Sequence, residues 1–146
     1  MQQRKMPTLA SVITPFPYQI DYLASLDSAQ RLMKQHGIRH LIVMRDNDFY
    51  SLISQHDLQR HAVLYEVERE RDLTVDDLCV DSVVCADIND PLDRVLDSMA
   101  DKQLGSVVVL REGELAGILT TIDACKQFAE YLRDSRAMTT VPDELA

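Results

Sequence analysis

The sequence predicts an α+β fold made of two copies of one small unit, related by pseudo-twofold symmetry. The first observation is an internal repeat, since residues 8–65 align on residues 74–131 without a gap, at a constant offset of 66 residues. The second is that each copy alternates apolar runs of strand length with amphipathic stretches of helix length. Identical residues occur at several matched positions, among them Asp21 and Asp87, Met33 and Met99, Val43 and Val109, and Asp57 and Asp123.

The length of the chain sets the expected domain organisation. With 146 residues it has the size of one compact domain, and each copy alone is close to the lower limit for an independent core. The two copies are therefore expected to share a core. We predict a first repeat with its N-terminal segment and connector at residues 1–72, a second repeat at 73–133 and a C-terminal tail at 134–146.

The first copy begins with a short strand and a helix. The N-terminal segment enters the fold up to about residue 13. The prolines of Pro15–Pro17 cannot donate ladder hydrogen bonds, so residues 18–20 are at best a short edge strand. Apolar residues spaced i, i+3, i+6 and i+7 from Leu26 predict an amphipathic helix, which ends where Gly37 can take a left-handed cap.

A hairpin and a second helix complete the first copy. The apolar run 41–44 predicts a strand buried on both faces, and after a polar turn the chain returns as a strand at 49–53. A helix at 55–66 then leads into the charged connector 66–72. The second copy repeats these elements as a strand at 83–86, a helix at 92–99, strands at 107–110 and 115–119, and a helix at 122–133.

Composition and charge exclude several classes of protein. The net charge of −9 argues against partners such as nucleic acid or an anionic membrane, which require a sustained basic face. No apolar run is long enough to span a bilayer, and no apolar segment follows the first seven residues as in a secretory signal. We therefore expect a cytoplasmic protein. Cys79, Cys85 and Cys125 lack C-x-x-C spacing and are expected to be reduced thiols.

Each hairpin is followed by a hydroxyl residue with an aspartate three positions later. Ser54 and Asp57 stand at this place in the first copy, and Thr120 and Asp123 stand there in the second. A hydroxyl at the start of a helix with an acid three residues on has the form of a capping box. Helix capping is therefore one interpretation of these four residues.

The same segments carry a longer pattern. In Gly117–Asp123 a glycine, two apolar residues, a threonine, two variable residues and an aspartate follow one another, and Ser51–Asp57 repeats this pattern with serine in place of the glycine. The pattern resembles the signature of the CBS domain, named after cystathionine β-synthase, and the resemblance covers both copies. It implies a CBS pair, or Bateman module, with two clefts that often hold adenine nucleotides. Two further departures are Ile42 and Val108, where many family members have proline.

The resemblance implies that the hydroxyl residue and the aspartate contact the ribose of the ligand. Ser54 and Asp57 would do so in one cleft, and Thr120 and Asp123 in the other. A carboxylate accepts hydrogen bonds from ribose hydroxyls, and free N–H groups at a helix start attract phosphate. Ribose contact and simple capping both remain open. Apolar walls are expected from Ile20, Tyr22 and Ile38 on one side and from Ala86, Ile88 and Leu104 on the other.

Positive charge distinguishes the two copies. In the family a basic residue before the second strand often reaches phosphate, and Arg39 stands at that place, whereas the second copy has Gly105 there and offers little positive charge except Lys126. We hypothesise that the clefts are inequivalent and that phosphate is held mainly by Arg39, with His40 or His56. The alternative is that these basic side chains are simply solvated.

The sequence favours a regulatory protein over an enzyme. No catalytic set with matching repeat positions, glycine-rich phosphate loop or metal-ligand spacing is present, and no cofactor is required. The first interpretation is a homodimeric module that binds AMP, ADP, ATP or S-adenosyl-methionine as a regulatory ligand and signals in trans to a protein effector. The alternative is a scaffold that dimerises without a ligand.

Overall fold

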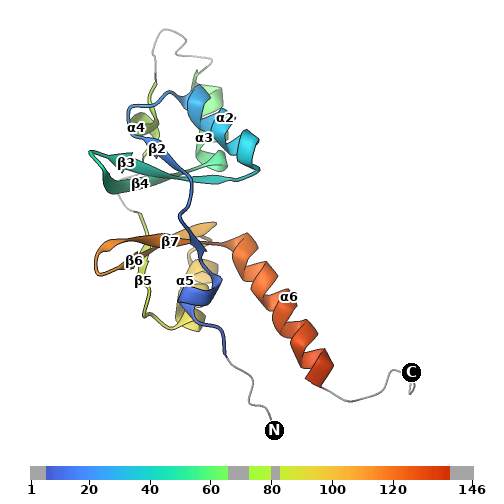
Figure 1. Cartoon of the computed structure of the whole chain (residues 1–146). Helices are drawn as coiled ribbons and strands as arrows, with labels where there is room; N and C mark the ends of the chain where they lie inside the picture. Colours follow the sequence, from blue (N-terminus) through green and yellow to red (C-terminus); the bar gives the residue numbers. More distant parts are fainter. Residues whose placement is uncertain (1–5, 66–72, 80–82, 139–146) are drawn as a thin grey trace.

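The computed structural model describes residues 6–65, 73–79 and 83–138. It confirms the α+β class, because two small sheets lie one above the other at the centre of the molecule and helices cover their outer sides (Figure 1). The first sheet contains β2 (Gln19–Asp21), β3 (His40–Arg45) and β4 (Asp48–Ser54), in the order β2-β3-β4. The second contains β1 (Thr14–Pro15), β5 (Cys85–Asp87), β6 (Ser106–Arg111) and β7 (Glu114–Thr120), in the order β1-β7-β6-β5.

The predicted repeat is confirmed for every element except β1, whose counterpart residues lie outside the described ranges. In each half a short strand pairs in parallel with the first strand of an antiparallel hairpin, and the hairpin carries a register shift at the same place, after Val43 in one half and after Val109 in the other. The helices are α1 (Leu9–Val12), α2 (Leu26–His36), α3 (Gln55–Tyr65), α4 (Val75–Leu78), α5 (Leu92–Asp101) and α6 (Thr121–Met138). Each of α4, α5 and α6 begins 66 residues after its counterpart α1, α2 or α3.

The two hydrophobic cores exchange their leading helices. Leu9 of α1 is buried with the core of the second half, beside Val95 and Leu119. In return, Val75 and Leu78 of α4 are buried with the core of the first half. The repeats defined by the sequence and the two packed cores are therefore offset from each other, since each core is completed by a helix that precedes the other repeat.

The apolar strands of the two hairpins face two cores at once. Leu41 and Val43 pack against the helices of the first half, whereas Ile42, which points to the other face of the same strand, is also fully buried. Val108 occupies the matching place in the second half and is fully buried too. The two sheets turn the faces away from their helices toward each other (Figure 1), and side-chain alternation along the strands puts Ile42 and Val108 on those faces. Burial on both faces explains the unbroken apolar runs in the sequence.

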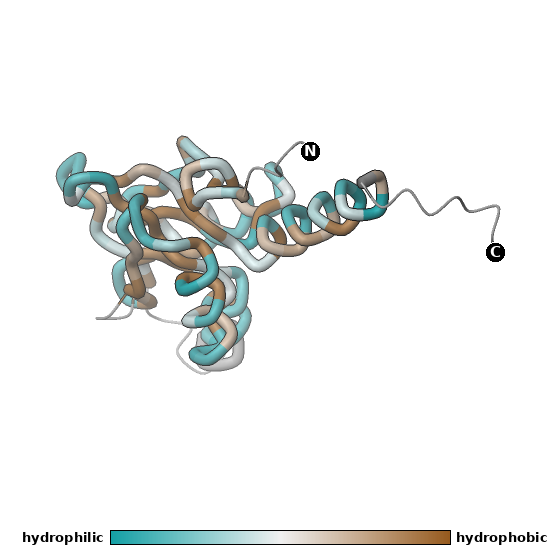
Figure 2. Tube along the Cα trace, turned by 90° about the horizontal axis from the view of Figure 1, so that it is seen from below, coloured by the Kyte–Doolittle hydropathy of each residue, from teal (hydrophilic) through white to brown (hydrophobic). Residues whose placement is uncertain are grey.

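The C-terminal helix is longer than predicted. We expected it to end at Arg133, but α6 continues to Met138, because no glycine or proline interrupts the chain before Pro142. Beyond its first turns α6 runs away from the rest of the molecule (Figures 1 and 2), and apolar residues along it remain exposed. None of the helices in the described ranges is long and apolar enough to cross a membrane.

Candidate functional site

The candidate site is built around the two junctions at which β4 leads into α3 and β7 leads into α6. In the first, the backbone N–H and the hydroxyl of Ser54 donate to Oδ2 of Asp57 at 2.9 and 2.8 Å, and the Asp57 N–H donates to Ser54 Oγ at 3.1 Å. In the second, Thr120 and Asp123 make the same three bonds at 2.9, 2.9 and 3.1 Å. The predicted capping boxes are thus confirmed at both junctions.

The second carboxylate oxygen has a different partner at each junction. At the first junction, Nη2 of Arg60 lies 2.9 Å from Oδ1 of Asp57. At the second, the hydroxyl of Thr14, in β1, donates to Oδ1 of Asp123 at 3.2 Å. Both aspartates lie in the first turn of their helix, where the unpaired N–H groups favour negative charge. The first carboxylate is therefore paired with a guanidinium group whose side chain is 63% exposed, and the second accepts from a hydroxyl group.

Glycine is required at only one of the two junctions. A Cβ on Gly117 would lie 2.6 Å from the carbonyl oxygen of Thr14, so β1 can pair with β7 only because Gly117 has no side chain. Ser51 occupies the equivalent place in β4, and among the described residues the first sheet has no strand matching β1. The residues equivalent to β1, at positions 80 and 81, lie outside the described ranges.

Ser51 itself is buried, and its hydroxyl is poorly paired. Its side chain is 2% exposed, and among the described residues its Oγ has no nitrogen or oxygen partner; its one polar neighbour is the thiol of Cys79, a weak hydrogen-bonding group. The thiol of Cys79 lies nearby but donates to the carbonyl oxygen of Val75 at 3.4 Å. Burial raises the pKa of Cys79, so this thiol is a poor nucleophile. Cys85 and Cys125 are exposed free thiols.

His40 lies where the two halves meet. A Cβ on Gly105, which belongs to the second half, would come within 3.3 Å of His40 Nε2. Burial lowers the pKa of His40, the negative charge of Asp57 opposes this, and the positive charge of Arg39 adds to it. The structure therefore brings His40 close to Asp57, as expected for one site, and favours its neutral form, which is a weak partner for phosphate.

The other predicted phosphate ligands are at the surface. The side chain of Arg39 is exposed, and its carbonyl oxygen accepts from the N–H of Gln55 at 2.8 Å. His56 is exposed in the first turn of α3, and Lys126 is exposed on α6. Their contact with a ligand stays a prediction.

The six predicted wall residues are partly buried in the two cores. Tyr22 also makes an edge contact with Tyr50, with 6.0 Å between ring centroids, and the guanidinium of Arg45 lies over both rings. Packing against a core does not test whether these side chains also line a ligand cleft, so that role stays a prediction. Ile20, Tyr22 and Ile38 pack against the first core, and Ala86, Ile88 and Leu104 pack against the second.

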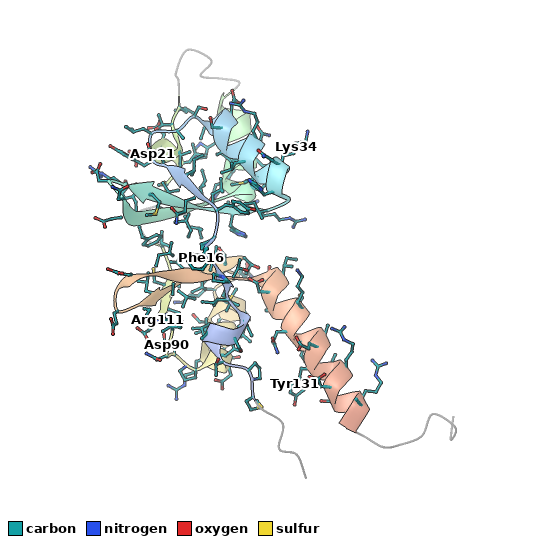
Figure 3. All side chains as sticks on the ribbon, in the orientation of Figure 1. Phe16, Asp21, Lys34, Asp90, Arg111 and Tyr131 are labelled. Carbon is teal, nitrogen blue, oxygen red and sulfur yellow. The ribbon has the colours of Figure 1, made fainter. Side chains whose placement is uncertain are left out.

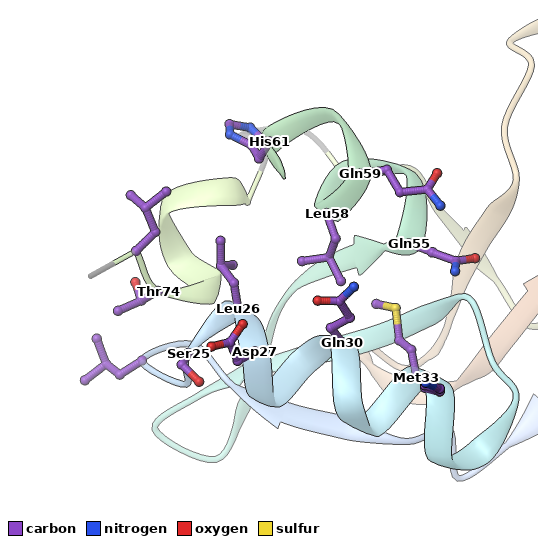
Figure 4. A pocket seen from close by; sticks show the side chains of 13 residues that line it. Ser25, Leu26, Asp27, Gln30, Met33, Gln55, Leu58, Gln59, His61 and Thr74 are labelled. Atoms are coloured by element: carbon purple, nitrogen blue, oxygen red, sulfur yellow. The ribbon is translucent and has the colours of Figure 1, made fainter. Parts of the chain in front are cut away.

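A cavity of about 880 Å³ opens elsewhere, between α2 and α3 (Figure 4). Its lining includes Leu26, Met33 and Leu58 together with the polar Gln30 and Gln59, and it contains none of the four motif residues. Sequence patterns gave no indication of this cavity. In the described parts of the chain, no three histidine, cysteine or acidic side chains lie together in a way that could hold a metal ion.

Two contacts of the candidate site were not predicted from the sequence. Arg60 follows Asp57 by three residues on one helix, a spacing that brings side chains together and that could have indicated the ion pair. Thr14 and Asp123 are separated by 109 positions, and no local pattern connects them.

Comparison with known proteins places the chain in a family. A sequence model of the CBS domain matches residues 9–63 and 75–130. A candidate acetoin utilization protein (AcuB) from Vibrio cholerae is 19% identical over 91% of this chain and 98% of its own, with a TM-score of 0.78. The CBS domain pair of protein MJ0100, solved with 5′-methylthioadenosine and S-adenosyl-L-methionine, is 18% identical over 87% and 99%, with a TM-score of 0.76.

A third solved structure, CBSX2 in complex with AMP, is 20% identical over 85% of this chain and 97% of its own, with a TM-score of 0.72. No curated protein matches the chain. The family match covers both repeats and more than half of the residues, and the solved structures share the tandem fold. The chain belongs to the CBS domain family, as a pair of CBS repeats.

Proposed function

We propose that the protein is a regulatory module that binds an adenine-containing nucleoside or nucleotide where its two halves meet. The observation that carries the proposal is the hydrogen bond from the Thr14 hydroxyl to the Asp123 carboxylate. A carboxylate that already accepts from a hydroxyl group of another segment offers the acceptor that a ribose hydroxyl needs. The complexes of related CBS pairs with AMP, 5′-methylthioadenosine and S-adenosyl-methionine support this ligand class.

Asp123 contacts several segments of the chain, so a ligand bound to it can change how these segments are arranged. Its carboxylate joins the end of β7, the start of α6 and, through Thr14, the exchanged strand β1. A ligand that replaces the Thr14 hydroxyl changes how these three segments are held together and so favours one arrangement over another. A protein effector acting in trans would read that change. AMP, ADP, ATP and S-adenosyl-methionine are the candidate ligands, none of them a required cofactor.

The proposal includes a cytoplasmic homodimer. Ile122, Phe128 and Leu132 of α6 are exposed apolar residues on a helix that leaves the body of the molecule (Figure 1). Covering such residues with a second copy is favourable, and two-fold dimers are the most frequent symmetric assemblies. The same surface supports the alternative, a scaffold whose function is the dimer itself and whose motif residues only cap helices.

Thermal unfolding midpoints measured with a panel of nucleotides distinguish the ligand sensor from the scaffold, with a variant of another capping box as control. A ligand at 100 times its dissociation constant adds about 2.7 kcal/mol to the free energy of unfolding. The midpoint of the wild type should rise with AMP, ADP, ATP or S-adenosyl-methionine, and not with the guanine nucleotides. The rise should disappear in Asp123→Ala.

Asp77→Ala is the control, because Thr74 and Asp77 form a capping box of the same type on α4, with the Thr74 N–H donating to Asp77 Oδ2 at 2.8 Å. This variant loses a capping carboxylate and should keep the ligand response. A flat panel at millimolar ligand with the wild type would reject the sensor and leave the scaffold.

A further inference from the structure

Phe16 is the most exposed of the large apolar side chains in the described chain. It is 95% exposed and stands between β1, on the second sheet, and β2, on the first. Figure 3 labels it between the two sheets, at the point where the chain passes from one half to the other. An isolated apolar side chain on a surface is ordinary, so exposure alone carries no function. The conformation of this residue supplies a second observation.

The backbone of Phe16 is strained. Its φ of 49° lies in the left-handed region, which a bulky aromatic residue rarely adopts, and the following Pro17 further restricts the residue before it. The other described non-glycine residues with positive φ are polar and lie in turns. Strain of this kind persists where the surrounding structure enforces it, and it concentrates at ligand sites. The two flanking prolines make the backbone of the segment stiff, which fixes the point from which the ring projects. The polar set consists of Asp46, Asn47, Gln103 and Glu112.

The chain itself connects Phe16 to the proposed ribose acceptor. Thr14, two residues earlier, is bonded to the Asp123 carboxylate, and two residues of chain span at most about 7 Å. A nucleoside whose ribose replaced the Thr14 hydroxyl at Asp123 would have its base within reach of this ring. Bases stack on exposed aromatic rings regardless of sequence context, because every base has a flat π face.

The first junction has neither feature. At the offset of 66 residues, the counterparts of Thr14 and Phe16 are Val80 and Ser82, which have no aromatic ring and, at position 80, no hydroxyl group. The carboxylate of Asp57 is paired with the guanidinium of Arg60. The two junctions are therefore unequal in the parts that a nucleoside would use.

We propose that the ligand binds at the junction beside Asp123 and that Phe16 is the platform on which the base of the ligand stacks. This inference rests on the proposed function. It assigns the ribose to Asp123 and the base to Phe16, and it explains an aromatic residue that is both strained and exposed. It also predicts one ligand per chain.

The experiment uses the absence of tryptophan from the chain. Phe16→Trp introduces a single tryptophan at the platform, and Leu23→Trp introduces one at an exposed apolar residue of the first half as the matched control. On titration with AMP or S-adenosyl-methionine, the tryptophan emission of Phe16→Trp should change to saturation at one equivalent, and that of Leu23→Trp should not. Calorimetry should show Phe16→Ala binding about tenfold more weakly or worse, with Phe16→Trp close to the wild type.

The outcomes separate this inference from the function beneath it. If the wild type binds AMP or S-adenosyl-methionine and Phe16→Ala binds with the same dissociation constant, the platform is wrong and the sensor stands. If the wild type binds none of the panel, both are wrong. Should Phe16→Ala fail to fold, the fluorescence of Phe16→Trp decides alone, and an unchanged emission on saturation overturns the inference.

Discussion

The hydroxyl of Thr14 donates to the carboxylate of Asp123 at 3.2 Å, across 109 positions of sequence. Thr14 belongs to the strand that enters the fold first, and Asp123 to the first turn of the last helix. The contact exists because Gly117 lets β1 approach β7. One glycine therefore decides how the N-terminal segment meets the C-terminal helix.

Replacing Gly117 by serine, the residue of the first half, should displace β1. The added Cβ would meet the Thr14 carbonyl oxygen at 2.6 Å, closer than atoms pack. We expect a loss of about 1–3 kcal/mol in the free energy of unfolding, measured by urea denaturation. Glu114→Ser, at an exposed position of the same strand, is the control, and equal losses in the two variants would contradict the prediction.

Removing the hydroxyl of Ser51 should stabilise the protein. The group is buried, and among the described residues only the weakly bonding thiol of Cys79 lies beside it, so the folded state carries most of the desolvation cost of the hydroxyl. Ser51→Ala is expected to raise the free energy of unfolding by about 1 kcal/mol in the same denaturation experiment. A lower stability would show that the hydroxyl has a partner in solution.

His40 should make stability depend on pH. Burial lowers its pKa below 6.5 in the folded state, so the unfolded chain binds more protons, and stability falls as the pH drops through 6.5. Above pH 6.5 the imidazole is neutral in both the folded and the unfolded chain, so its titration costs no stability there. His40→Gln should flatten the loss between pH 8 and pH 5.5, measured as free energy of unfolding at each pH. His56→Gln, at an exposed position, should keep the wild-type profile, and identical slopes in both variants would refute the assignment.

Phe128→Glu tests the proposed dimer. Phe128 is 62% exposed on α6, and a charge placed in a buried contact would oppose association. Sedimentation should show the mass of a dimer for the wild type and of a monomer for the variant. Glu130→Ala, at an exposed polar position of the same helix, should remain dimeric. A wild type that sediments as a monomer would end the proposal.

The fold could be predicted because local sequence patterns indicate its helices and strands, and because these patterns occur in both repeats. Apolar spacing from Leu26 and the run at 41–44 each indicate one element, and the repeat supports each of these elements through its counterpart. The end of α6 could not be predicted, because the repeat says nothing about residues beyond Tyr131.

The site could be predicted only in part. Ser54 with Asp57 and Thr120 with Asp123 are neighbours in sequence, so their pairing follows from spacing. Thr14 and Asp123 are far apart in sequence, and their contact depends on the packing of α1 and β1 with the second half. Which core a leading segment joins is decided by packing in three dimensions, where both cores offer similar apolar surfaces.

The exchange of α1 and α4 makes the two halves unable to exist separately. A chain cut in the connector would leave the first half without the helix that fills its core at Val75, and the second half without Leu9. Each fragment would expose a groove shaped for a piece of the other. The two fragments, mixed, would be expected to recombine into one particle, so that a duplicated sequence behaves as a single cooperative unit.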